Sequence, residues 1–406
     1  MTMPVEEFRA KARAWLSAHA PRMSDEDDVR ADRFQPQDVA AYKRIQRELF
    51  DAGLAGITWP TEYGGLGLTD EHYLAFNDEA ADYAIPAVNS IGFGHCAPTI
   101  IDLGTEAQKQ QTLLPMLRGE TIWCQLFSEP SAGSDVAGLR TRAELDGDEW
   151  VVNGQKVWTS GAHVSDFGCL LARTDTSVPK HNGLTMFIID MRAPGVTVRP
   201  LKQATGDAPF NEVYFDDLRL PATAVLGEVN GGWATAVLML RHERISIGTS
   251  ARSSARPLSY DSVLAFARKL GRTADPLVRD RLAALYAYDA SGTLLGQRMR
   301  QEVDAGMELR ARGSIPKLSG SAIVRMAIDV VDEVGGGDLI AWEGAEYPRP
   351  TYGVVEAPSY GIGGGTNEIQ RGIIGERVLG LAKDPQLDRE IPFNELRPMI
   401  APPPTR

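Results

Sequence analysis

The spacing of apolar residues predicts helices over the first part of the chain. Apolar side chains recur there every three or four positions, which is the period of one face of a helix. The clearest such face contains Val5, Phe8, Ala12, Trp15 and Leu16. Residues 106–118 repeat the same period, and Gly119 follows as a helix terminator. We therefore expect residues 1–120 to form an N-terminal α-helical domain.

From residue 121 the apolar pattern favours strands. Residues 149–158 read Glu-Trp-Val-Val-Asn-Gly-Gln-Lys-Val-Trp, and an Asn-Gly pair between two such runs is a strong hairpin signal. We therefore expect two strands joined by a turn at Asn153-Gly154. Three more strand-like runs, bounded by Gly and Pro, are residues 184–191, 196–200 and 211–215. Residues 121–230 are thus predicted to be a middle β domain.

The helical period returns after residue 230. Long amphipathic stretches cover residues 233–244, 277–300 and 323–334, so residues 231–385 are predicted to form a C-terminal α-helical domain. Residues 386–406 are a Pro-rich tail that should wrap a surface or fray. A chain of 406 residues exceeds what one core usually supports. The pattern predicts an α+β protein with a β module between two helical blocks.

Composition and charge narrow the class of protein. The chain is 43% hydrophobic and 24% charged, as a folded globular protein is. Its net charge of -12 argues against duplex nucleic acid as a partner. An anionic small ligand stays compatible, because helix N-termini and local arginines hold phosphates in acidic proteins. No run approaches the ~20 apolar residues of a membrane span, and no secretory signal is evident.

The cysteines and histidines show no metal or disulfide pattern. Cys96, Cys124 and Cys169 are odd in number and have no CxxC spacing. Buried, reduced thiols in a cytoplasmic protein are the simplest interpretation. The six histidines are scattered without metal-ligand spacing, so we expect no metal.

Residues 126–135 have the chemistry of a phosphate- and flavin-binding turn. They read Leu-Phe-Ser-Glu-Pro-Ser-Ala-Gly-Ser-Asp. Pro130 and Gly133 favour a turn that leaves backbone N–H groups free, and Ser128 and Ser134 add hydroxyl groups. An ordinary surface turn is the alternative.

Residues 359–374 form the most informative segment. They read Ser-Tyr-Gly-Ile-Gly-Gly-Gly-Thr-Asn-Glu-Ile-Gln-Arg-Gly-Ile-Ile. The glycines allow the backbone to approach a ligand closely, and Thr366 or Asn367 is suited to cap a following helix. No apolar strand leads into this cluster, which argues against a dinucleotide-binding fold.

These two segments, together with Lys-Val-Trp-Thr-Ser at 156–160, resemble the acyl-CoA dehydrogenase family. The resemblance implies a helical N-terminal domain, a middle β-barrel or sandwich and a C-terminal four-helix bundle. It implies FAD as cofactor, an acyl-CoA thioester oxidised to the trans-2-enoyl-CoA, and an electron-transfer flavoprotein or similar acceptor. Tetramers are implied, and the motifs are most similar to actinobacterial members of sterol side-chain breakdown, some of which have two unlike subunits.

The resemblance also assigns flavin contacts by position. Ser128 would bond the flavin ring, and Gly133 with Ser134 would hold the pyrophosphate. Trp158 and Ser160 would flank the isoalloxazine from the neighbouring strand. Two further cofactor contacts implied in the C-terminal signature are Thr366 and Glu368.

One substitution falls at the position of the usual catalytic base. In much of the family a glutamate precedes the Gly-Thr pair and removes the substrate α-proton, but here the residue is Gly364. The resemblance offers Glu243 instead, on a "His-Glu-Arg" helix with Arg244 as its charged neighbour. A Glu-Arg pair on a helix can equally be a surface ion pair without a catalytic role. Glu368 is a weaker candidate for the base. The Gly364 backbone N–H would still polarise the thioester carbonyl.

Residues that a subunit usually lends to its neighbour's FAD differ from the family pattern. The Arg followed by Phe-Gly is absent from residues 266–275, and residues 332–336 have no Gln before Gly-Gly. The chain resembles the base-carrying member of a mixed assembly, while a homomeric relative stays possible. A silent flavin-binding subunit and an acyl-CoA oxidase are the rival functions.

Overall fold

A computed structural model describes residues 3–22, 34–249, 258–307, 309–341, 349–383, 385 and 388–396. Within these ranges the side chains at 244–249, 300, 303–304, 310, 338 and 349 are not described. Of the Pro-rich tail, only 388–396 belongs to the described part.

The N-terminal part is helical, as the apolar period predicts. Its helices are α1 Val5–His19, α2 Pro36–Asp51, α3 Asp70–Ala80, α4 Ala97–Leu103 and α5 Glu106–Leu117. Phe8, Ala12 and Leu16 are buried on one face of α1. Thr105 caps α5 by accepting a hydrogen bond from the Gln108 amide, and the helix is followed by Gly119 with φ +68°. The predicted core face and the predicted terminator are therefore confirmed.

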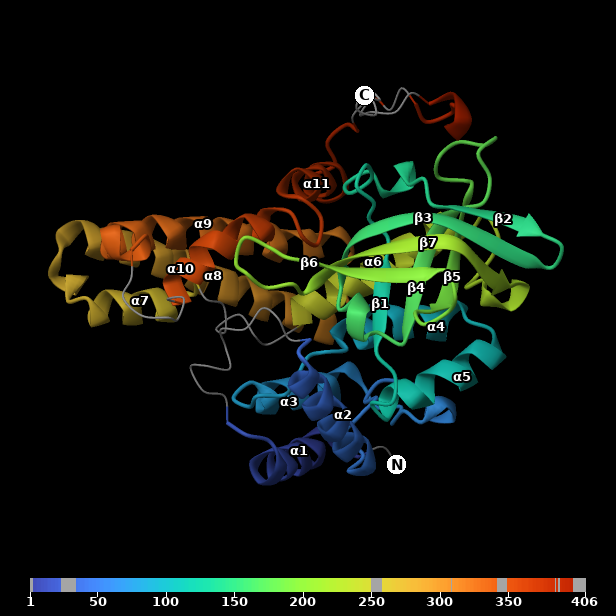
Figure 1. Cartoon of the computed structure of the whole chain (residues 1–406). Helices are drawn as coiled ribbons and strands as arrows, with labels where there is room; N and C mark the ends of the chain where they lie inside the picture. Colours follow the sequence, from blue (N-terminus) through green and yellow to red (C-terminus); the bar gives the residue numbers. More distant parts are fainter. Residues whose placement is uncertain are drawn as a thin grey trace.

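The middle part is one mixed sheet. Its strands are β1 Trp123–Leu126, β2 Arg142–Asp146, β3 Glu149–Ser160, β4 Phe167–Arg173, β5 Leu184–Asp190, β6 Val196–Leu201 and β7 Phe210–Pro221. Their order is β1-β4-β2-β3-β7-β6, and β5 pairs with β4. The first strand runs parallel to β4, whereas β3 is antiparallel to both β2 and β7. Figure 1 shows the N-terminal helices below this sheet.

The predicted hairpin turn at Asn153-Gly154 is wrong. β3 runs through these residues without a turn, and the hairpin instead closes between Asp146 and Glu149, which pair across β2 and β3. At Gly154 the pairing of β3 with β7 shifts register, and a Cβ there would lie 2.5 Å from Thr141 Oγ1. Asn153 donates a hydrogen bond to Asp217 across the same irregularity. The Asn-Gly pair therefore lies in a β-bulge, where the absence of a side chain at Gly154 allows β3 to come close to Thr141.

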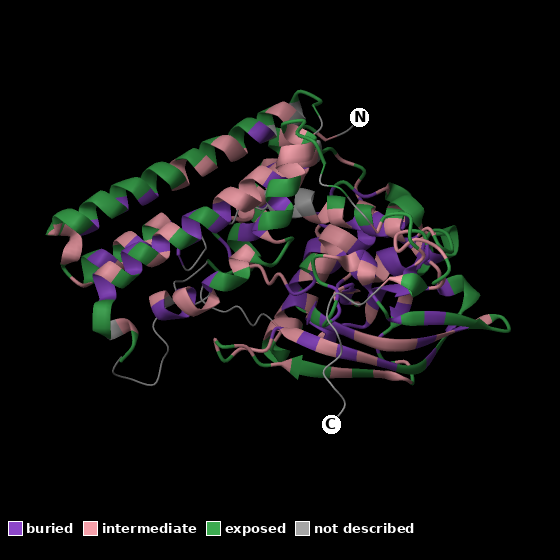
Figure 2. Cartoon of the chain, turned by 90° about the horizontal axis from the view of Figure 1, so that it is seen from above, coloured by how far each residue is buried: buried purple, intermediate pink, exposed green. Residues whose placement is uncertain are grey.

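The C-terminal part is again helical. Its helices are α6 Gly232–Thr249, α7 Tyr260–Lys269, α8 Pro276–Asp304, α9 Ser314–Gly335, α10 Arg349–Glu356 and α11 Asn367–Ile373. A shared apolar core joins α7, α8 and α9 through residues such as Val263, Leu285 and Val331. This block extends away from the sheet (Figure 1), and Figure 2 shows exposed residues along much of it. The predicted helix–strand–helix order is confirmed.

The three cysteines are buried and free, as expected. Burial raises the pKa of the Cys124 thiol to about 12, so this thiol stays protonated and unreactive at neutral pH. Among the described helices, none is both long and apolar enough to cross a membrane.

Candidate active site

A tight turn follows β1 at the position of the predicted flavin-binding segment. Glu129 and Ala132 exchange two backbone hydrogen bonds of 3.0 Å, which closes the turn. Gly133 and Ser134 are exposed beyond it, and Ser128 is half-buried. A Cβ built at Gly133 would meet nothing within 4 Å, so the space beside this residue is open. The turn therefore offers accessible backbone and hydroxyl groups to a ligand.

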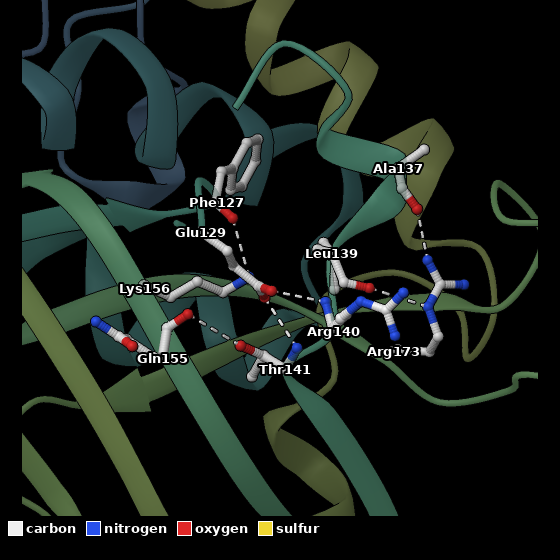
Figure 3. A network of polar contacts seen from close by, with 9 residues as sticks. All are labelled: Phe127, Glu129, Ala137, Leu139, Arg140, Thr141, Gln155, Lys156 and Arg173. Carbon is white, nitrogen blue, oxygen red and sulfur yellow. Dashed lines mark hydrogen bonds and ion pairs between the residues drawn. The ribbon is translucent and has the colours of Figure 1, made fainter. Parts of the chain in front are cut away.

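A buried ion pair anchors this turn to the sheet (Figure 3). Lys156 Nζ lies 2.8 Å from Glu129 Oε1 and also donates to the Phe127 carbonyl at 2.9 Å. Glu129 accepts two further hydrogen bonds, from the amides of Arg140 and Thr141, at 2.7 and 2.9 Å. A buried charge is tolerated when it is paired and hydrogen-bonded in this way. The sequence analysis did not single out this pair, although its two residues lie in the two segments assigned to the flavin.

The pKa values of the pair reflect burial and mutual attraction. Burial favours the neutral form of Glu129, but Lys156 and the hydrogen bonds to the carboxylate outweigh it and hold the pKa of Glu129 below its ordinary value. Burial lowers the pKa of Lys156, and Glu129 opposes that shift only in part. At neutral pH the Glu129 carboxylate is therefore ionised, and Lys156 stabilises its negative charge.

The turn lies directly beside Trp158 and Ser160. The Val157 amide donates to the Ser128 carbonyl at 2.9 Å, which places the turn along β3. Trp158 has φ +60° and is 57% exposed, with its ring edge-on to Phe210. Ser160 is half-buried, and the residue between them is buried. An exposed aromatic residue in a conformation that is uncommon for non-glycine residues is a candidate for ligand contact.

Glu243 lies on the inward-facing side of α6. Met239 and Ala236, one and two turns earlier on the same face, are fully buried in the core cluster shared with Ile100 and Met186. Glu243 continues this face and is half-buried. The preceding residue, His242, forms a 2.9 Å contact with Asp102 of α4. The Arg244 side chain is outside the description.

The C-terminal signature forms a glycine turn and a capped helix. Gly364 has φ +66° and is exposed, and its carbonyl accepts a 2.8 Å hydrogen bond from Gln370. Thr366 caps α11 by accepting from the Ile369 amide. This confirms the capping role expected of Thr366 or Asn367. Glu368 is exposed and pairs with Arg371 at 3.3 Å, as a surface glutamate does.

The contacts described above bring together only part of the predicted site. The contacts above bring the turn (Ser128, Gly133, Ser134) together with Trp158 and Ser160. Glu243 lies on α6 and Gly364 precedes α11, and within the described residues no hydrogen bond or ion pair links these two to each other or to the turn.

Comparison with known proteins agrees with the division of the chain into a helical, a β and a second helical part. Three family models match the chain: the acyl-CoA dehydrogenase N-terminal domain over residues 4–120, the middle domain over 124–218 and the C-terminal domain over 230–379. "Acyl-CoA dehydrogenase IpdE1" of Mycobacterium tuberculosis is 37% identical, with 94% of this chain and 98% of that protein covered.

Solved structures are similar over the whole fold. The "Tcur3481-Tcur3483 steroid ACAD" has a TM-score of 0.77 and 29% identity, covering 94% of this chain and 99% of that one. The ChsE4-ChsE5 complex from Mycobacterium tuberculosis has a TM-score of 0.74 and 29% identity, covering 95% and 99%.

The helical–β–helical succession matches all three domains of a family whose members are oxidoreductases that act on CH–CH bonds with a flavin acceptor. The chain belongs to the acyl-CoA dehydrogenase family. As a member of this family it binds FAD, and the open turn, the hydroxyl groups of Ser128 and Ser134 and the exposed indole are suited to the phosphates and the flat ring of that cofactor.

Proposed function

We propose that the chain oxidises an acyl-CoA thioester to the trans-2-enoyl-CoA, with Glu243 as the base that takes the α-proton. When bound, FAD supplies the hydride acceptor, flavin N5. The residues of the chain hold the cofactor, remove the proton and stabilise the thioester carbonyl. The position of Glu243 on the inward-facing side of α6 is the observation that carries this proposal.

Three positions in the sequence are candidates for the base, and two of them carry a carboxylate. Position 364 has no side chain, and Glu368 is exposed and neutralised by Arg371. Glu243 is half-buried and lies on the same face of α6 as the buried apolar residues Ala236 and Met239. A general base needs a carboxylate that is shielded from bulk water and held near its proton, so Glu243 is the best supported of the three. Arg244 is proposed as its charged neighbour.

Gly364 is proposed to act through its backbone. Its carbonyl is engaged by Gln370, which steadies the turn at φ +66°. The N–H of Gly364 is then the group available to the thioester carbonyl oxygen, where a fixed donor stabilises the negative charge that develops as the α-proton leaves.

Ser128, Gly133, Ser134, Trp158 and Ser160 are proposed to hold FAD. The pyrophosphate would lie at Gly133 and Ser134, and the flavin ring between Ser128, Trp158 and Ser160. The contact of Val157 with Ser128 supports this, because it places both sets of groups on one surface. Thr366 and Glu368 are proposed as contacts contributed by the C-terminal signature.

The acyl group is proposed to be a steroid side chain. This rests on the similarity to a structure described as a steroid ACAD. An electron-transfer flavoprotein is the proposed acceptor, and an oligomer, homomeric or mixed, the proposed assembly. The relatives include the ChsE4-ChsE5 complex, which supports the mixed version.

The arrangement of the C-terminal block also supports an oligomer. Residues 266–275 and 332–336, which depart from the family pattern, are adjacent because Arg272 donates to the Val334 carbonyl. They lie at the end of the block far from the sheet (Figure 1). We propose that this end of the block faces a flavin site on another subunit. A silent flavin-binding subunit and an acyl-CoA oxidase stay the rival functions.

Stopped-flow reduction of the bound flavin by acyl-CoA tests the base. Glu243→Gln should retain FAD but lose on the order of 10²–10⁴ in the rate of flavin reduction. Glu228→Gln, at an exposed position just before α6, is the matched control and should behave as wild type. Reduction of the Glu243→Gln flavin within threefold of wild type would reject Glu243. A wild-type protein that binds FAD but is never bleached by any acyl-CoA would support the silent-subunit function.

A further inference from the structure

Residues 388–396, here called the C-terminal strap, lie along the loop that joins β4 to β5. The Phe393 amide donates to the Val178 carbonyl at 2.9 Å, and the Asn394 amide donates to the Thr176 carbonyl at 3.0 Å. Pro392 pairs with Pro179 in an isolated bridge. Figure 1 shows the strap in red beside this loop, at the side of the sheet opposite the N-terminal helices. Part of the Pro-rich tail therefore wraps a surface.

A lysine joins the strap to the flavin turn. Lys180 Nζ lies 2.8 Å from Asp388 of the strap and 3.1 Å from Asp135, the residue after Ser134. Burial works to lower the pKa of Lys180, but the two carboxylates outweigh it and raise that pKa. The same contact lowers the pKa of Asp388. Lys180 thus stays charged at neutral pH and balances Asp135, which would otherwise place a negative charge beside the proposed pyrophosphate position.

An arginine makes the second connection. The Arg173 guanidinium lies 3.6 Å from the centre of the Phe393 ring, a cation–π contact. The same guanidinium donates to the Leu139 carbonyl at 3.2 Å and to the Ala137 carbonyl (Figure 3). The Arg173 backbone amide donates to Thr141 at 2.7 Å. Phe393, only 8% exposed, therefore covers the cation that holds residues 137–141, which directly follow the flavin segment.

We propose that the C-terminal strap is a positioning element for the FAD-binding turn. It holds Lys180 against Asp135 and covers Arg173, and so keeps residues 128–141 in the conformation that binds the pyrophosphate. Phe393 and Asp388 are positioning residues that act through Arg173 and Lys180. The inference rests on the proposed placement of the pyrophosphate at Gly133 and Ser134, and is independent of the base.

Two truncated chains test the proposal. One ends at Lys383 and lacks the strap, and the other ends at Leu396 and lacks only residues 397–406. FAD is titrated into each apoprotein, and binding is followed by quenching of flavin fluorescence. The chain ending at Leu396 should bind FAD as the full chain does. The chain ending at Lys383 should bind about tenfold more weakly, the combined effect of one cation–π contact and one ion pair. Affinities within twofold of each other would overturn the proposal.

Two point variants of the full chain distinguish the effect of the Phe393 aromatic ring from that of an apolar side chain alone. Phe393→Leu retains an apolar side chain but loses the contact with Arg173, and should weaken FAD binding about threefold or more. Phe393→Tyr retains the ring and should restore wild-type affinity. Equal affinities for the two variants would contradict a role for the cation–π contact.

Hydrogen exchange in the apoprotein tests, in the absence of cofactor, whether the C-terminal strap stabilises the conformation of residues 128–141. The Arg140 and Thr141 amides, which are bonded to Glu129, should exchange faster in the chain ending at Lys383 than in the chain ending at Leu396. Unchanged exchange would overturn the positioning role. Faster exchange with unchanged FAD affinity would overturn the link to the cofactor and would place the pyrophosphate elsewhere. Neither result depends on whether Glu243 is the base.

Discussion

Lys156 of β3 and Glu129 of the turn after β1 form an ion pair of 2.8 Å that is almost completely withdrawn from solvent. The two residues come from the two segments assigned to the flavin, and Lys156 lies two positions before Trp158. The pair therefore fixes the turn and the strand relative to each other. Its carboxylate also binds the amides of Arg140 and Thr141, so one buried group organises the whole segment.

Removing one partner of this pair should be more harmful than removing both. Glu129→Gln leaves Lys156 buried without an opposite charge, and we expect a loss of about 3–5 kcal/mol in the free energy of unfolding. Glu129→Gln combined with Lys156→Met should recover a large part of it. Urea unfolding followed by tryptophan fluorescence measures both. A loss below about 1 kcal/mol in the single variant would contradict the charged state of the pair.

The stability that Glu129 contributes should disappear in acid. Its pKa is held below the ordinary value of 4.5 in the folded protein, so the folded state binds this proton more weakly than the unfolded state. The contribution is fully present above pH 4.5 and is lost as the pH falls through the folded-state pKa. The difference in unfolding free energy between wild type and the double variant should therefore stay constant from neutral pH to 4.5 and shrink below it. A difference that grows in acid would show that the pKa of Glu129 is raised in the folded protein and not lowered.

A negative charge at Ser134 should expel FAD. Ser134→Asp places a carboxylate beside the proposed pyrophosphate position, where like charges repel, and the protein should purify as apoprotein. Ser131→Asp is a control in the same turn, at another exposed position. The ratio of absorbance at the flavin band to that of protein measures occupancy. Full occupancy in Ser134→Asp would show that the phosphates bind elsewhere.

Loss of the helix cap at Thr366 should destabilise the C-terminal signature. Thr366→Ala removes the acceptor for the Ile369 amide, which should lower the free energy of unfolding by about 1 kcal/mol. Thr366→Ser keeps the hydroxyl and should be close to wild type. Thermal unfolding of both variants provides the measurement, and equal melting temperatures would argue against the cap.

The mixed assembly makes a prediction about the protein expressed alone. If a partner subunit completes the flavin site, the isolated chain should lose FAD on dilution and retain it when co-expressed with that partner. Analytical ultracentrifugation with flavin absorbance follows both mass and occupancy. A stable homotetramer from one gene, fully flavinylated and active, would exclude the mixed version and retain the oligomer.

Local patterns in the sequence were enough to predict the order of elements and the turn at residues 128–135. Apolar spacing predicted α1, α5 and the long C-terminal helices, because helix periodicity depends on neighbours three and four residues away. The turn at 128–135 and the Thr366 cap were predicted for the same reason, since their chemistry is contained within a few residues. The family resemblance rested on these short segments and is confirmed by all three family models.

Interactions between distant residues were decided only by the tertiary structure. Asn153-Gly154 has the local preference of a hairpin turn, but contacts with Thr141 and Asp217 make it a bulge inside β3. The pairing of Glu129 with Lys156 joins residues 27 positions apart, and that of Lys180 with Asp388 spans 208. No local pattern specifies such partners, because burial and charge compensation depend on which segments the fold brings together.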